Sequence, residues 1–230
     1  MDTTDYAKEY AKLGITDSFY LAYRDLPHLV EKYVKGKEAL DYGCGGGRST
    51  RFLKKLGLNV VGVDTLPSMI QEARSRDPQG KYYLITSGDL TKLGHQTFDL
   101  ILSVAVFIAI PSLEEMARIL SEMKRVLRKE GTAIIITGTA DIYTRNWASF
   151  ICNFPENRGL NSGDQAKVVI RGTNITLYDY LWTDEDYKQA ISNAGLRLIK
   201  THQPMPTGKE PYTWHSETKH PLWTIYILKK

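Results

Sequence analysis

ALDYGCGGGR, at residues 39–48, is an apolar strand that runs into a cluster of glycines and then into a helix. Glycines are needed in such a turn because only a chain without side chains lets the backbone pass close to a ligand. The peptide N–H groups and the N-terminus of the following helix then face that ligand. A glycine cluster alone is a weak signal, so its interpretation depends on the residues downstream of the turn.

The second feature is an acidic residue at the end of the next predicted strand. Residues 60–64 read VVGVD, and Asp64 follows Gly43 by 21 positions. An acid about 20 residues beyond such a turn accepts hydrogen bonds from ribose hydroxyls. Together, the glycine cluster and Asp64 predict a nucleoside-binding site.

The same turn argues against a dinucleotide ligand. The dinucleotide pattern G-x-G-x-x-G requires a glycine where this sequence has Arg48. Asp41, two residues before the first glycine, would repel a pyrophosphate but suits a ligand with cationic groups. The sulfonium and ammonium of S-adenosylmethionine are such groups, so this nucleoside is favoured.

Around this turn, short apolar runs alternate with amphipathic segments. Continuous Val, Ile and Leu runs are typical of buried, mostly parallel strands, and the helices between them cover both faces of the sheet. Strands are predicted at 38–43, 59–64, 81–86, 98–106, 132–140, 196–203 and 222–230, and core helices at 47–57, 67–76, 112–129 and 183–195. The fold class is therefore α/β, a Rossmann-like doubly wound sheet of seven strands.

Three segments stand outside this alternation, and we expect all of them to belong to a single domain spanning 1–230. Residues 1–36 contain helices predicted at 3–13 and 18–34, the second kinked or broken at Pro27. The insertion 140–182 is too long for a plain connection and contains two strands around Gly172-Thr173-Asn174, which suggests a cap over the sheet. A second insertion occupies 203–221.

Composition narrows the partners and the compartment. The 230 residues carry a net charge of +4 with dispersed basic residues, so no nucleic-acid footprint is visible. The most apolar stretch, 100–110, is too short to span a membrane, and the N-terminus does not resemble a signal peptide. We expect a cytoplasmic protein with Cys44 and Cys152 as free thiols, no metal site and no membrane partner. The oligomeric state stays open.

Four motifs in order, LDYGCGGGRST, VVGVD, SGDL and FDLILS, resemble the successive motifs of class I S-adenosylmethionine-dependent methyltransferases. The resemblance covers 38–138 closely and the remaining sheet by pattern. It implies a sheet whose last strand is antiparallel, S-adenosylmethionine as cofactor, and methyl transfer by in-line displacement.

The resemblance also implies roles for individual residues. Asp41 and the backbone of Gly43 and Gly45 would hold the methionine part, and Asp64 the ribose. The remaining cofactor residues it implies are Asp89 and Leu90 at the adenine amino edge, Met69 against adenine, Ser103 and Val104 near the methionine end, the adjacent Cys44 and Thr65, and Tyr10, Tyr20 and Arg24 of the N-terminal helices. Each has a structural alternative: Asp89 as a turn residue, Met69 as core filling, and the tyrosines as packing.

The acceptor side is less determined. Where the family uses a base, it often follows the fourth strand, but VAVFIAI at 104–110 offers none. An acceptor that is already nucleophilic, such as a thiolate, a carboxylate or a neutral amine, would fit. Asp141 and His215 are the candidate bases, with His215 alternatively a plain loop residue. Candidate substrate contacts are Tyr143, Asn146, Trp147, Tyr178, Tyr180, Trp182 and Trp214, which could also form a small core under the loops.

Three functions remain open at this point. A methyltransferase acting on a small-molecule metabolite is favoured, partly because the motif of enzymes that methylate DNA bases or protein glutamine is absent. A cyclase or lyase of the same fold would instead release methylthioadenosine. A regulatory module would bind the cofactor without turnover.

Overall fold

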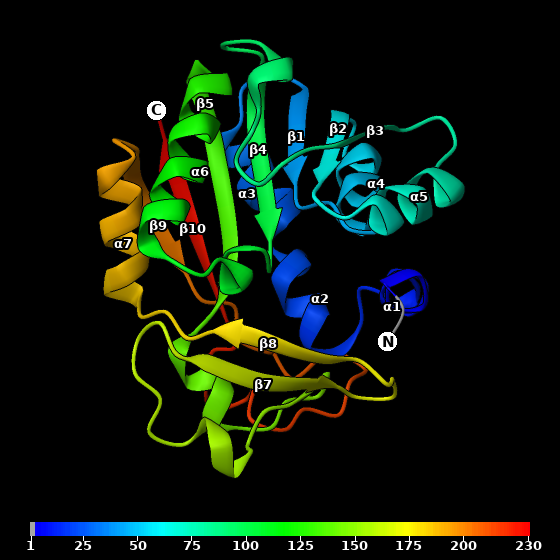
Figure 1. The fold of residues 1–230 in the computed structure, drawn as a ribbon, viewed down its shortest axis with the longest axis vertical. Coiled ribbons are helices and arrows are strands. Elements are labelled where there is room, and N and C mark those ends of the chain that lie inside the picture. Colours follow the sequence, from blue (N-terminus) through cyan, green and yellow to red (C-terminus); the bar gives the residue numbers. More distant parts are fainter. Residues whose placement is uncertain (1–2) are drawn as a thin grey trace.

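The computed structural model describes residues 3–230 and contains the predicted seven-stranded sheet (Figure 1). The strand order is β3-β2-β1-β4-β5-β10-β9, and β10 is antiparallel to both neighbours. The first five strands of that order are parallel to one another. Their bounds are β1 Glu38–Tyr42, β2 Asn59–Asp64, β3 Lys81–Leu84, β4 Phe98–Val104, β5 Leu127–Gly138, β9 Arg197–His202 and β10 Trp223–Lys229.

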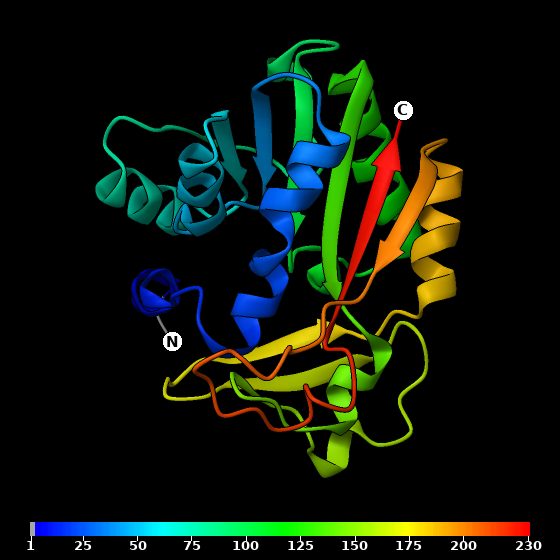
Figure 2. The same ribbon diagram turned by 180° about the vertical axis from the view of Figure 1, so that it is seen from behind.

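Helices cover both faces of the sheet because successive strand side chains point to opposite sides. On β5, Ile134 and Ile136 join the core with α2, α3 and α4, whereas Ala133 and Ile135 join the core with α6 and α7. Figure 2, the view from behind, shows α2 and α3 in front of the sheet, on the face turned away from the reader in Figure 1. The helices are α1 Thr3–Lys12, α2 Asp17–Arg24, α3 Leu26–Tyr33, α4 Arg48–Lys55, α5 Pro67–Arg76, α6 Leu113–Val126 and α7 Asp184–Asn193.

Local signals explain where several helices begin and end. The predicted break at Pro27 is confirmed, since α2 ends at Arg24 and α3 begins at Leu26, with proline in the first turn. Ser112 caps α6, and Thr183 forms a reciprocal capping box with Asp186 at the start of α7.

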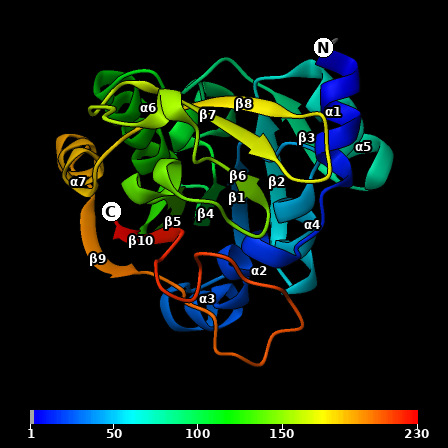
Figure 3. The ribbon, with the colours of Figure 1, turned by 90° about the horizontal axis from the view of Figure 1, so that it is seen from below.

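The insertion after β5 forms a separate three-stranded sheet, β6-β7-β8, which lies across the carboxyl ends of the main strands (Figures 1 and 3). Its strands are β6 Phe150–Ile151, β7 Gln165–Ile170 and β8 Thr176–Tyr180, and short 3₁₀ turns lie at η1 Thr91–Leu93, η2 Phe107–Ala109, η3 Ala140–Thr144 and η4 Pro155–Asn157. The carboxyl ends of parallel strands are where open α/β sheets bind ligands. The small sheet therefore covers the edge at which a site is expected.

The second insertion is tied to the cap through Glu217, whose buried carboxylate accepts hydrogen bonds from Ser18 Oγ and the Ala148 and His215 N–H groups. Trp223 Nε1 donates to the Ser18 carbonyl nearby. These bonds fix α2 and the cap to each other.

None of the described helices is long and apolar enough to cross a membrane.

Candidate active site

The turn between β1 and α4 has a backbone that requires glycine. Gly43, Gly45 and Gly47 have φ angles of 74°, 51° and 79°. A Cβ atom on Gly43 would lie 2.2 Å from Cγ2 of Val106, which follows β4. The N–H groups of Gly43 and Cys44 donate to the Val63 carbonyl of β2 at 2.8 and 2.9 Å. The turn is thus held between the ends of β2 and β4.

Asp41 lies behind this turn and is fully buried. Its Oδ2 accepts hydrogen bonds from Ser49 Oγ at 2.7 Å and Thr50 Oγ1 at 2.6 Å, which ties the first turn of α4 to β1. Its Oδ1 has no hydrogen-bond partner within residues 3–230. Burial raises the pKa of Asp41 to about 6.

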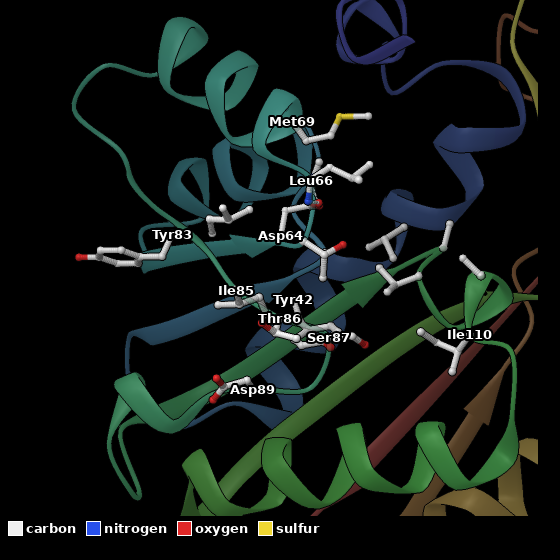
Figure 4. A pocket seen from close by; sticks show the side chains of 18 of the residues that line it. Tyr42, Asp64, Leu66, Met69, Tyr83, Ile85, Thr86, Ser87, Asp89 and Ile110 are labelled. Carbon is white, nitrogen blue, oxygen red and sulfur yellow. Dashed lines mark hydrogen bonds between the residues drawn. The ribbon is translucent and has the colours of Figure 1, made fainter. Parts of the chain in front are cut away.

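Asp64 closes the other side of the turn and lines a cavity of about 1020 Å³ (Figure 4). Its Oδ2 accepts from the Gly45 N–H at 2.8 Å, and its Oδ1 accepts from the Leu66 N–H at 2.9 Å. Burial raises the pKa of this carboxyl too. Each carboxylate oxygen has a second lone pair, so Asp64 can accept further hydrogen bonds from a ligand.

The cavity extends past the ends of β2, β3 and β4 (Figure 4). Met69 and Leu66 line it beside Asp64, and Tyr83, Ile85 and Asp89 line its outer part. The Asp89 carboxylate is exposed and accepts hydrogen bonds from the side chain and N–H of Thr91, which lower its pKa.

A half-buried cation, Arg48, lies at the start of α4 beside the glycine turn. The Arg48 guanidinium lies 4.4 Å from the Phe19 ring centroid and 5.8 Å from that of Tyr10, and it donates to the Gly14 carbonyl at 3.1 Å. A small cavity of about 30 Å³ separates it from Gly43 and Gly45. The sequence drew attention to Arg48 only as a departure from the dinucleotide pattern, and its place in this cavity was missed.

A second, mostly apolar cavity of about 110 Å³ lies between the end of β4 and the cap. It shares Tyr6, Tyr10, Ala105 and Ala109 with the large cavity, so the two adjoin. Ala105 has a φ of 55°, a conformation that is costly outside glycine and that persists where the surrounding structure enforces it. The other lining residues are Phe19, Ile108, Ile142, Phe150, Val168, Ile170, Leu177, Asp179 and Trp223.

Asp179 on β8 is the acidic member of this lining and was not among the predicted site residues. Its side chain is buried, with 6% exposure, and it forms no hydrogen bond or ion pair within the part of the chain that the structure describes. Burial alone raises its pKa to about 7. The sequence did offer one indication that Asp179 faces the interior. Side chains two positions apart in a strand lie on the same face, which places Asp179 beside Leu177.

Comparisons with known proteins agree with this geometry. A family described as "Methyltransferase domain" matches residues 40–135. Malonyl-[acyl-carrier protein] O-methyltransferase of Salmonella typhimurium is 33% identical over 202 residues, covering 76% of this chain and 78% of that protein. The chain belongs to the class I S-adenosylmethionine-dependent methyltransferases.

Two further relatives are similar over most of the chain. N-demethylindolmycin N-methyltransferase of Streptomyces griseus is 27% identical over 191 residues, covering 81% of this chain and 78% of that protein. The crystal structure of an S-adenosylmethionine-dependent methyltransferase from Clostridium acetobutylicum superposes with a TM-score of 0.66 at 15% identity, covering 98% of this chain and 97% of that one. The latter match shows the shared fold.

The methyltransferase fold brings most of the predicted cofactor residues to one cavity. Those that line the large cavity are Tyr10, Gly43, Gly45, Asp64, Thr65, Met69, Asp89 and Val104. Cys44 lines the small cavity beside Arg48. Asp41, Leu90 and Ser103 are fully buried and line neither, so any part they have in binding passes through the backbone or through their neighbours.

Two predicted residues of the N-terminal helices lie elsewhere. Arg24 pairs with Asp25 at 2.8 Å and Glu210 at 3.3 Å, on the second insertion. The Tyr20 ring packs against Tyr212 with centroids 5.3 Å apart. Neither side chain lines the cavities described above, whereas Tyr6 and Tyr10 of α1 line both of the larger ones.

The structure does not bring the predicted acceptor residues to the cavities. The Asp141 side chain is 62% exposed and pairs with Arg145, and His215 is exposed on the second insertion. Trp147 is buried and donates to the Ile142 carbonyl, and Trp182 is buried and donates to the Ile110 carbonyl. Tyr143, Asn146, Tyr180 and Trp214 are at least partly buried within the cap and insertion, and Tyr178 is exposed. Most of these aromatic residues thus pack in or against the two hydrophobic clusters that also contain the main sheet.

Proposed function

We propose that this methyltransferase transfers a methyl group to a small molecule whose reacting atom enters the 110 Å³ cavity. The observation that carries this proposal is the adjoining pair of cavities, because an in-line displacement needs donor and acceptor side by side. The cap encloses the smaller cavity with aromatic and aliphatic side chains. The names of two relatives, N-demethylindolmycin N-methyltransferase and demethylmenaquinone methyltransferase, support a small acceptor, whereas the Salmonella relative is named for a malonyl group on an acyl-carrier protein.

The residues present fit a cationic nucleoside. Two carboxylates, the fully buried Asp41 and the half-buried Asp64, flank the glycine turn, and one Asp41 oxygen lacks a hydrogen-bond partner within the described chain. In our proposal Asp64 holds the ribose hydroxyls, and the turn at Gly43 and Gly45 accommodates the methionine part. Arg48, in place of the predicted Arg24, pairs with the carboxylate of that part.

S-adenosylmethionine supplies the activated methyl group, so the chain has to position the acceptor and exclude water. Ala105 lines both cavities, and its side chain is small. The rings of Tyr6 and Tyr10 line both cavities and would exclude water from the reaction.

The proposal is tested with S-adenosylmethionine carrying a deuterated methyl group and a cell extract divided by size. We expect the label in the small-molecule fraction. Label found only in the protein or nucleic-acid fraction would refute a small acceptor.

We also infer a reducing, cytoplasmic setting. Cys44 and Cys152 are buried and unpaired, and burial raises the pKa of both thiols. Unpaired cysteines are typical of reducing compartments.

A further inference from the structure

The Asp179 carboxylate has no evident role in holding the fold. It is 6% exposed, lies in a cavity walled by Phe19, Phe150 and Trp223, and has no hydrogen bond or ion pair within residues 3–230. An isolated carboxylate in such surroundings is unfavourable unless a partner compensates its charge. By contrast, buried Glu217 accepts three hydrogen bonds from its neighbours.

The groups that surround Asp179 supply no such charge. Those that interact with it electrostatically are Tyr6 from α1, Tyr143 from η3, Tyr187 from α7 and Cys152. Burial raises the pKa of all four, so each is neutral near pH 7. None of these four groups supplies a countercharge, so a cationic group on a ligand in this cavity would be the partner of the ionised carboxylate.

We propose that Asp179 binds an amine on the acceptor and takes a proton from it, which makes this enzyme an N-methyltransferase of an apolar amine. The inference rests on the proposed function, since it places the acceptor in the smaller cavity. An ammonium group supplies the charge and the N–H donors that Asp179 lacks, and the aromatic walls take the carbon skeleton. An anionic acceptor would be repelled.

The chemistry balances without a further reactant. The acceptor enters as an ammonium ion and gives one proton to the Asp179 carboxylate, which frees the nitrogen lone pair. The lone pair then forms the N–C bond as the C–S bond breaks, and those electrons remain on sulfur in S-adenosylhomocysteine. The methylated ammonium leaves, and Asp179 returns its proton to solvent. A carboxyl pKa of about 7 suits this exchange near neutral pH.

The first test combines product analysis with Asp179→Asn, which keeps the side-chain shape and removes the charge. With deuterated S-adenosylmethionine and extract, we expect the wild type to place the label on nitrogen. Asp179→Asn should lower kcat/KM about 100-fold or more, the usual contribution of a general base. Affinity for S-adenosylmethionine should stay within about twofold, and Asp179→Glu should recover part of the activity. Glu156→Gln, an exposed carboxylate on the cap, is the matched control and should behave as wild type.

Several results would overturn the inference. Label on oxygen, sulfur or carbon would do so, as would an Asp179→Asn enzyme with nearly full activity. Weaker binding of S-adenosylmethionine but not of S-adenosylhomocysteine to this variant would assign the carboxylate to the sulfonium instead. In the first two cases the proposed function survives, because the wild type still methylates a small molecule.

A binding measurement tests the amine site even if no extract supports turnover. Absence of turnover would count against the proposed function and not against the amine site. The probes are benzylamine, benzyl alcohol and benzoate, added with S-adenosylhomocysteine while thermal stability is followed. We expect benzylamine to raise the Tm of the wild type most, and this preference to vanish in Asp179→Asn. Equal shifts for benzylamine and benzyl alcohol in the wild type would refute an amine site.

Discussion

At the scale of single residues, the acids differ in what surrounds them. Asp64 accepts two backbone hydrogen bonds, Asp41 accepts two hydroxyl hydrogen bonds, and Asp179 accepts none within the described chain. Asp41 and Asp64 were predicted from their spacing to the glycine turn. Asp179 was not, because its burial depends on how a distant insertion folds over the sheet.

Asp64→Ala should weaken S-adenosylmethionine binding about tenfold or more. Hydrogen bonds to a charged group contribute roughly 1.5–3 kcal/mol each, and the variant also frees the N–H groups of Gly45 and Leu66. Isothermal titration gives the affinity, and circular dichroism checks that the variant is folded. Unchanged affinity in a folded variant would contradict the ribose role.

At the scale of elements, the turn between β1 and α4 is defined by its contact with the residue after β4. Gly43→Ala should reduce both stability and cofactor affinity, because the added Cβ meets Val106 at 2.2 Å and the φ of 74° disfavours alanine. The φ term alone is about 1–2 kcal/mol.

Val106→Ala in the Gly43→Ala background should recover part of the loss, since it removes the contact at 2.2 Å but leaves the Val106 Cβ at 3.3 Å and the backbone strain. Urea denaturation of the two single variants and the double variant measures this coupling. Additive losses would show that the two residues do not press on each other.

The buried residues of the cap join the core of the main sheet, since Trp147 and Phe150 belong to the same hydrophobic cluster as Leu100 and Ile134. Trp147→Ala should lower the free energy of unfolding by about 3–5 kcal/mol, because Trp147 is fully buried and its Nε1 donates to Ile142. Denaturant titration tests this. If the variant instead kept wild-type stability and lost acceptor turnover, Trp147 would be a substrate contact, as predicted from the sequence.

At the scale of the whole molecule, the sequence predicted the sheet well but did not single out the residues that line the smaller cavity. The seven strands follow from local patterns of Val, Ile and Leu, and the two strands around residues 172–174 are confirmed as β7 and β8. The sequence predicts an aromatic cap, but composition does not distinguish a ring that lines a cavity from a ring in the core, so both interpretations of the cap aromatics stay open at the level of sequence. The cavity lining comes from α1, α2, η2, the cap and β10 together, a long-range arrangement that no local pattern encodes.

Buried acids whose pKa is raised also make the free energy of unfolding depend on pH. The folded-state pKa of Asp179 is about 7, above its ordinary value of 3.8, so the folded protein holds this proton more tightly than the unfolded chain. The contribution of Asp179 to the free energy of unfolding therefore decreases as pH rises from about 4 to about 7. Asp41 acts in the same direction up to about pH 6.

Asp179→Asn should consequently stabilise the protein more at alkaline pH. Relative to wild type, we expect its stability gain to be on the order of 2 kcal/mol larger at about pH 8 than at about pH 5. Denaturant titrations at both pH values measure the difference, with exposed Glu31→Gln as the control. A stability gain that does not change with pH would contradict a raised pKa of Asp179 in the folded protein.

The central claim is that this fold uses S-adenosylmethionine to methylate an acceptor. The most direct measurement is incubation with S-adenosylmethionine, with and without a pooled metabolite extract, followed by mass spectrometry of the sulfur products. We predict S-adenosylhomocysteine that forms only with extract. Methylthioadenosine formed without extract would contradict the account, because the cofactor would then itself be the substrate.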